Sequence, residues 1–133
     1  METSNQAVLS RQQAAVALRV AVRILRGWQA TVQQACRILR VSPATYYSAS
    51  RDQVTGRRLD LDQQQRVSLV LNIHASLRTL FTNPANVSSF PVLKNDNPFF
   101  DGRSPLDIMA QGDLISLYET YKRIDQMKWL GEA

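Results

Sequence analysis

Between residues 40 and 58 the chain carries hydroxyl and guanidinium groups at spacings that suit the surface of a helix. Hydroxyl groups can hydrogen-bond to base edges or phosphate, and arginine forks match the geometry of phosphate and guanine. The chemistry that these side chains offer is therefore recognition of a nucleic acid, without any bond being made or broken. The candidates for contact with double-stranded DNA are Arg40, Ser42, Ala44, Thr45, Tyr47, Ser48, Arg51, Arg57 and Arg58.

Two short helices must position these groups. The segment TVQQACRILRVSPATYYSASR, residues 31–51, has the pattern of a helix-turn-helix, with the small Ala35 where two helices approach closely. Ser42 can cap the second helix, and Pro43 suits its first position because no amide donor is needed there. Arg40 stands at the turn position where glycine is commonest. The pattern predicts that the second helix enters the major groove.

The charge divides unevenly along the chain. Residues 1–60 carry nine arginines against three carboxylates, whereas residues 61–133 carry seven basic and eight acidic side chains. The net charge of +5 thus belongs to the first half. An anionic polymer is the natural partner for that half.

Apolar residues recur at steps of three and four along most of the chain, and no segment has the two-residue period of a strand. We therefore expect an all-α fold, with a helix-turn-helix bundle over residues 1–58 and a small helical C-terminal domain over residues 59–133. The first helix has a narrow apolar seam suited to packing on another helix, either of this chain or of a second copy. The residues of this seam are Val8, Ala15, Leu18, Val22 and Leu25.

Composition and motifs argue against an enzyme. The chain is 44% hydrophobic and 20% charged, has no run long enough to span a membrane, and has one cysteine, so we expect a globular cytoplasmic protein. No glycine-rich phosphate loop or catalytic motif is present, and we expect no cofactor, metal or catalytic residue. Cys36 is interpreted as a small residue at a helix crossing, and His74 as a satisfied core or interface histidine.

The segment NPFFDGRSPLDIMAQGDLISLYETYKRIDQM, residues 97–127, holds two consecutive helix starts. Ser104 can cap the first helix, Pro105 suits its first position, and Asp107 lies where the positive helix end favours a carboxylate. Gly112 ends this helix, and the next residue starts another, so a sharp corner is expected. The expected buried stripe of the last helix is Leu114, Leu117, Tyr118, Tyr121 and Ile124.

This block resembles the C-terminal toxin-binding region of the Xre/MbcA/ParS antitoxin family. The resemblance rests on four motifs: Asn97-Pro98-Phe99-Phe100, Gly102-Arg103-Ser104-Pro105-Leu106-Asp107, Gly112-Asp113 and Arg123-Ile124-Asp125. It implies a type II antitoxin that docks on a RES-domain toxin, occludes the pocket where that toxin binds NAD, and represses its own promoter. It also fits the N-terminal half, because members of the family carry a helix-turn-helix there.

The toxin-binding candidates follow from that resemblance and from the usual role of arginine and aromatic side chains as energetic centres of an interface. Because two adjacent phenylalanines cannot easily both face inward, we expect one ring to be buried and the other free. For Trp129, core cover and partner contact both remain open. The candidates are Phe99, Phe100, Arg103, Asp107, Met109, Lys128 and Trp129.

Two other functions compete with this one. The chain could be a stand-alone helix-turn-helix transcriptional regulator whose C-terminal half only dimerises, or a structural adaptor that binds protein at both ends. A homodimer is expected in the antitoxin interpretation, because a helix-turn-helix commonly reads two half-sites, and a toxin would extend the dimer into a larger assembly.

Overall fold

A computed structural model describes residues 9–53 and 58–130 of the 133-residue chain. The described residues form seven α-helices and one short 3-10 helix, with no strand, so the all-α prediction is confirmed. The elements are α1 (Arg11–Gly27), α2 (Val32–Leu39), α3 (Pro43–Ser50), α4 (Leu61–Leu80), α5 (Pro84–Ser89), η2 (Phe90–Val92), α6 (Pro105–Met109) and α7 (Leu114–Leu130). Within the described part, no helix is both long and apolar enough to cross a membrane.

Side-chain caps set where the helices begin. Ser42 Oγ accepts a hydrogen bond from the Thr45 amide at 3.1 Å, and Ser104 Oγ accepts from the Asp107 amide at 3.0 Å. A proline follows each serine at the first helical position. The predicted starts of α3 and α6 are therefore confirmed. Each start is stabilised by a local hydrogen bond in which the serine hydroxyl accepts from a backbone amide that has no partner within the helix.

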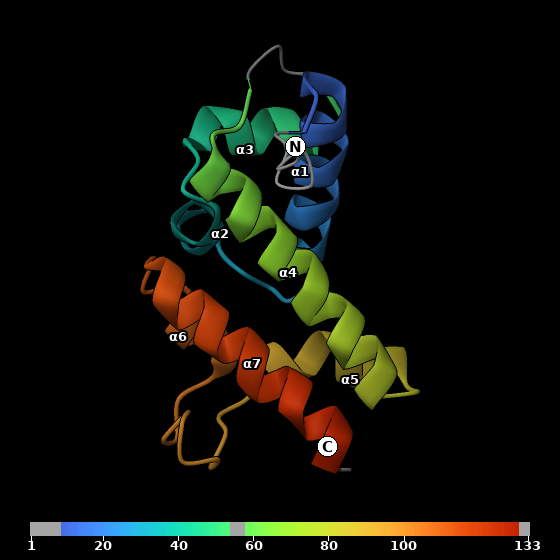
Figure 1. The fold of residues 1–133 in the computed structure, drawn as a ribbon, viewed down its shortest axis with the longest axis vertical. Coiled ribbons are helices and arrows are strands. Elements are labelled where there is room, and N and C mark those ends of the chain that lie inside the picture. Colours follow the sequence, from blue (N-terminus) through green and yellow to red (C-terminus); the bar gives the residue numbers. More distant parts are fainter. Residues whose placement is uncertain (1–8, 54–57, 131–133) are drawn as a thin grey trace, which may run out of the picture.

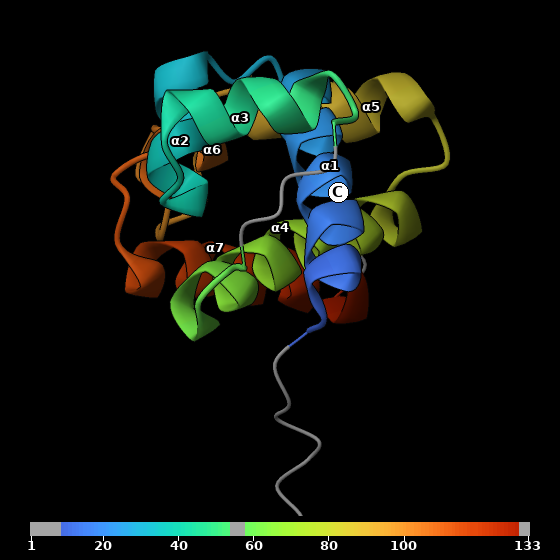
Figure 2. The same cartoon turned by 90° about the horizontal axis from the view of Figure 1, so that it is seen from above.

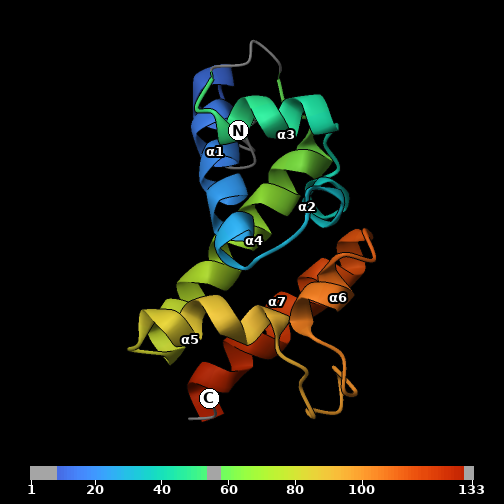
Figure 3. The same cartoon turned by 180° about the vertical axis from the view of Figure 1, so that it is seen from behind.

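The helices form two lobes joined along α4, the longest helix (Figure 1). α4 packs against α1 and α2 in one lobe and against α5 and α7 in the other. Seen from above, α4 and α7 lie on one side of the molecule, and α2, α3 and α5 lie on the other (Figure 2). The view from behind shows α5 and α6 in front of α4 and α7 (Figure 3).

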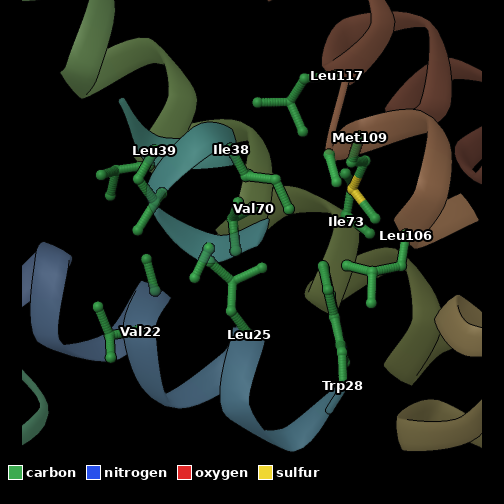
Figure 4. Packing of buried hydrophobic residues seen from close by; sticks show 14 of the residues in the cluster. Val22, Leu25, Trp28, Ile38, Leu39, Val70, Ile73, Leu106, Met109 and Leu117 are labelled. Atoms are coloured by element: carbon green, nitrogen blue, oxygen red, sulfur yellow. The ribbon is translucent and has the colours of Figure 1, made fainter. Parts of the chain in front are cut away.

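One hydrophobic cluster runs through both lobes. In Figure 4, Trp28, the residue after α1, points towards Ile73 of α4 and Leu106 of α6. Leu39 of α2 lies on the same side of the cluster as α1. Because α4 contributes to the core of both lobes, the two regions proposed at residues 1–58 and 59–133 share one core. The boundary between them stays a prediction.

The seam of α1 is used within the chain. Leu18, Val22 and Leu25 are at most 2% exposed, because α1 packs against α3 and α4 of its own chain. The expectation that the seam packs on another helix is therefore confirmed for its described residues, and the partners are helices of the same chain instead of a second copy; Val8 lies outside the described residues.

The buried stripe of α7 differs from the predicted one. Tyr118 is 46% exposed, and Thr120 and Met127 are buried instead. Thr120 is tolerated in the core because its hydroxyl donates a hydrogen bond to the Ser116 carbonyl at 2.8 Å. Helical period alone did not distinguish Tyr118 from Thr120, since both lie near the edge of the apolar stripe.

Candidate nucleic-acid and partner-binding surfaces

α3 has one face anchored in the core and one face turned outward. Tyr46 and Ala49 are buried and fix the helix against the rest of its lobe. Ala44, Tyr47 and Arg51 are exposed and Ser48 is half-buried, at steps of three and four that place them on one side of the helix. This outward face, with the exposed Ser42 before it, gathers hydroxyl groups, an aromatic ring and a cation at one surface.

Thr45 does not belong to that surface. Its side chain is 7% exposed, and its Oγ1 accepts a hydrogen bond from Ser42 Oγ at 3.0 Å. The prediction that Thr45 faces the major groove is therefore wrong. The reason is that position three of the helix points back at the capping residue, so its hydroxyl completes the cap.

Arg40 stabilises the turn between α2 and α3. It adopts a left-handed conformation with φ of 56°, which explains why glycine is common at such a position. Its guanidinium pairs with Asp60, and its Nε lies 2.6 Å from Asp62 Oδ2. The hydrogen bond from Arg40 holds the pKa of Asp60 below its usual value. The charge expected near the DNA backbone is thus already paired with Asp60, which caps α4, and with Asp62 in the first turn of that helix.

Other arginines surround α3. Arg51 and Arg58 are exposed, whereas Arg57 lies outside the described residues. Arg19 and Arg23 of α1 were not among the candidates predicted from the sequence, yet their guanidinium groups lie 3.8 and 3.6 Å from the Asp52 carboxylate just beyond α3. Their spacing of four residues on a helix was the available signal.

The loop before α6 is closed by its own backbone. Asn97 Oδ1 accepts from the Phe99 amide at 3.0 Å, and the Gly102 amide donates to the Asn95 carbonyl at 2.8 Å. The Phe100 ring is fully buried, while the Phe99 ring is half-buried and meets it edge-on at 5.1 Å. The expectation of one buried ring is confirmed. The other is only partly free, because the Arg123 guanidinium lies over Phe99 at 5.1 Å.

Two of the remaining candidates near α6 are exposed and one is not. Arg103 and Asp107 face solvent, although Arg103 Nε also donates to the Phe100 carbonyl at 3.1 Å. Met109 is fully buried. The expectation that Met109 offers an apolar contact to a partner is therefore wrong, because α6 is so short that its apolar side chains are all used in the core.

At the end of α7, Trp129 is 81% exposed, so it covers no core in the described chain. Lys128 Nζ lies 2.7 Å from Asp125 Oδ1, and the hydrogen bond from Lys128 lowers the pKa of Asp125. Trp129 follows Arg123 by less than two helical turns, about 9 Å along the axis. An exposed indole at a helix end is a strong candidate for partner contact.

Two arginines join the helix-turn-helix to the α6–α7 corner. Arg66 of α4 is 6% exposed and donates to the carbonyls of Gly112 at 2.7 Å and Ile38 at 3.3 Å. Arg37 Nε donates to the Ala110 carbonyl at 2.9 Å. Gly112 has φ of 93°, which lets the chain turn the corner beside Arg37. The two candidate surfaces are therefore held by one polar network.

Cys36 and His74 were the other reactive side chains in question. Cys36 is half-buried beside the core, and burial raises the pKa of its thiol. His74 is half-buried, but its Nδ1 has no hydrogen-bond partner among the described residues, so it is not the satisfied histidine expected. Among those residues, no three His, Cys, Asp or Glu side chains gather where they could hold a metal ion.

Comparison with known proteins gives two matches. Residues 7–72 match the family described as "Antitoxin Xre-like helix-turn-helix domain", a range that contains α1, α2, α3 and the first half of α4. The chain is also 30% identical over 108 residues to "Uncharacterized protein y4oB" of Sinorhizobium fredii (strain NBRC 101917 / NGR234), covering 80% of this chain and 79% of that protein. No solved structure matches the chain significantly.

Proposed function

Because the chain belongs to the Xre-type antitoxin family, we propose that it is a type II antitoxin that neutralises a RES-domain toxin and represses its own operon. The neutralisation is steric, with no cofactor: the C-terminal lobe occupies the pocket where the toxin binds NAD. The observation that carries the proposal is the pairing of an antitoxin helix-turn-helix with a second surface of exposed charged and aromatic groups.

The DNA-binding part of the proposal rests on the outward face of α3. Tyr47, Ser48 and Arg51 reach the major groove, while Ala44 permits close approach of the helix to a base pair. The exposed Arg58 and the exposed Arg23 of α1 bind DNA phosphates on either side of α3. Because most of the positive charge is concentrated in this lobe, promoter binding should fall steeply with salt.

The toxin-binding part rests on the C-terminal surface and on the resemblance of its motifs to the toxin-binding region of the family. Arg103 and Asp107 orient the toxin, Phe99 gives a partly exposed ring, and Trp129 offers the largest exposed apolar side chain. Lys128 lies beside Trp129 and adds a cation at the rim of the contact.

A charge-reversal experiment tests the proposal. The triple variant Arg51→Glu, Arg57→Glu, Arg58→Glu should lose promoter binding in a gel-shift assay, yet still restore growth when co-expressed with the toxin encoded by the adjacent gene. Arg78→Glu is the matched control. Arg78 is an exposed arginine near the C-terminal end of α4, away from α3, so this variant should bind DNA normally. Loss of growth rescue together with DNA binding would contradict two separable surfaces.

A stand-alone transcriptional regulator remains the second candidate, because the match to the antitoxin helix-turn-helix ends at residue 72. In that case the C-terminal lobe only supports dimerisation. Co-purification with a small enzyme encoded next to this chain selects the antitoxin, whereas promoter binding without any such partner selects the regulator.

A further inference from the structure

A pocket lies between the C-terminal part of α4 and α5, and neither proposed binding surface uses it. We call it the α4–α5 pocket. Its volume of about 480 Å³ is within the range of sites that bind small molecules. Two views show α5 beside this end of α4, away from α3 (Figures 1 and 3). Among the residues that line it are His74, Arg78, Phe81, Thr82, Val87 and Ser88.

The pocket combines buried apolar side chains with exposed polar ones. Val87 is 7% exposed and Phe81 is half-buried. Arg78, Thr82 and Ser88 are exposed, and each carries a group that can donate a hydrogen bond. Sites for small molecules pair an apolar lining with a few polar groups that fix the orientation of the ligand. This lining therefore suits a ligand with an apolar body and one polar end.

His74 adds a further donor. It precedes Arg78 by four residues, so both lie on the same side of α4. Burial, and the positive charge of Arg78, lower the pKa of His74, so the imidazole is neutral near physiological pH. Its Nδ1 is enclosed without a hydrogen-bond partner among the described residues, whereas Nε2 is not enclosed in this way. Since enclosed N–H groups without an acceptor are rare, we expect the proton on Nε2, where it can be donated to a ligand.

No carboxylate balances the positive charge at this pocket. The chain has 11 acidic residues, yet none lies between Asp62 and Asp96, the stretch that supplies the whole lining. Among the described residues, Arg78 forms no ion pair. A guanidinium without an acidic partner, surrounded by other donors, favours an anion, and its planar fork matches the two oxygens of a carboxylate.

We propose that the α4–α5 pocket binds a small organic monocarboxylate, with the carboxylate at Arg78 and His74 Nε2 and the apolar body against Phe81 and Val87. Because His74 is neutral, one full positive charge faces the pocket, which matches a monoanion better than a phosphate group of charge near −2. The inference goes beyond the proposed function, since it needs neither a toxin nor DNA. Arg78 belongs to neither of the two proposed binding surfaces.

NMR titration of the ¹⁵N-labelled full chain with sodium benzoate tests the inference. Benzamide is the matched ligand, because it has the same ring and nearly the same shape without the charge. For benzoate we expect saturable shifts of the backbone amides of residues 74–88, with a Kd of about 1 mM, an ordinary affinity for a ligand of this size. Benzamide should bind about tenfold more weakly or less, because it forms no charge-assisted hydrogen bond with Arg78.

Two variants locate the carboxylate. Arg78→Met removes the guanidinium and keeps an apolar stem, and His74→Phe keeps a ring and removes the Nε2 donor. Each should weaken benzoate binding by about tenfold or more. Lys94→Met is the matched control. Lys94 is also an exposed cation, but it lines a neighbouring pocket that shares only Phe81 with this one, so the affinity should stay within about twofold.

Circular dichroism should show that Arg78→Met and Lys94→Met keep the fold, because both replaced side chains are exposed. The inference would be overturned by the absence of saturable shifts up to about 20 mM benzoate, well above the expected Kd. It would also be overturned by benzamide binding as tightly as benzoate, or by full affinity in Arg78→Met. A loss of affinity in Lys94→Met with none in Arg78→Met would place the anion in the neighbouring pocket and contradict the assignment.

Discussion

Arg66 gives the sharpest test of how the two lobes are joined. Its side chain is 7% exposed, donates from Nη1 to the carbonyls of Gly112, Ile38 and Arg37, and places Nε 2.9 Å from Asp62 Oδ2. The substitution Arg66→Met keeps an unbranched apolar stem in the same space. It removes the donors and leaves the carbonyl of Gly112 without its short hydrogen bond.

The expected loss follows from these distances. A hydrogen bond from a charged donor contributes about 1.5–3 kcal/mol, and the bond to Gly112 at 2.7 Å belongs to that range. The two bonds at 3.3 Å are long and add about 0.5 kcal/mol each. Asp62 keeps an ion-pair partner in this variant, because Arg40 still pairs with it. The total is about 3 kcal/mol, or about 10 °C in Tm for a domain of this size.

Urea unfolding followed by circular dichroism measures this change. The control is Arg78→Met, an exposed arginine on the same helix, for which a change within about 0.5 kcal/mol is expected. If Arg66→Met lost less than about 1 kcal/mol, the assignment of Arg66 as the residue that ties α2 to the α6–α7 corner would be refuted.

Three further variants probe the corner, the core histidine and the α3 face. Gly112→Ala should destabilise by about 1–2 kcal/mol in urea, because φ of 93° strains any side chain, although the nearest atom, Arg37 Cβ at 3.6 Å, leaves room; an unchanged midpoint would contradict this. Burial lowers the pKa of His74, so the unfolded state takes up a proton first and stability should fall as pH drops below 6.5. His74→Gln should flatten that slope in urea titrations across pH, and an identical slope would be the contrary result. Tyr47→Ala should weaken promoter binding in a gel shift with little effect on thermal stability, because the ring is 45% exposed. If thermal stability fell as much as promoter binding, the ring would serve mainly to pack the fold and not to contact DNA.

Helix positions could be predicted from the sequence because their signals are local. Ser42 with Pro43, Ser104 with Pro105, and Gly112 each act on amides within a few residues, and each appears in the structure where it was expected. Arg40 was expected only to occupy the turn position where glycine is commonest, and the structure shows that this position has a left-handed conformation. These features need no knowledge of how the lobes pack.

Contacts between distant residues could not be predicted in this way. Arg40 and Asp60 are twenty residues apart, and Arg66 and Gly112 are forty-six apart, so no spacing rule connects them. The role given to Met109 failed for the same reason, whereas Thr45 was misjudged for a local one, because its hydroxyl accepts from Ser42 at the helix cap. Whether a side chain at the edge of a helical stripe is exposed depends on the neighbouring helix, and that neighbour is known only after folding.

Hydrogen–deuterium exchange of the chain, alone and in complex with the proposed RES-domain toxin partner, tests the central claim most directly. The claim is that the C-terminal lobe holds the toxin while α3 stays free for DNA. It predicts slower exchange in residues 97–107 and in the last turns of α7 on complex formation, with the exchange of α3 unchanged. Protection confined to α2 and α3, or a toxin that leaves the exchange of the C-terminal lobe unaltered, would contradict it.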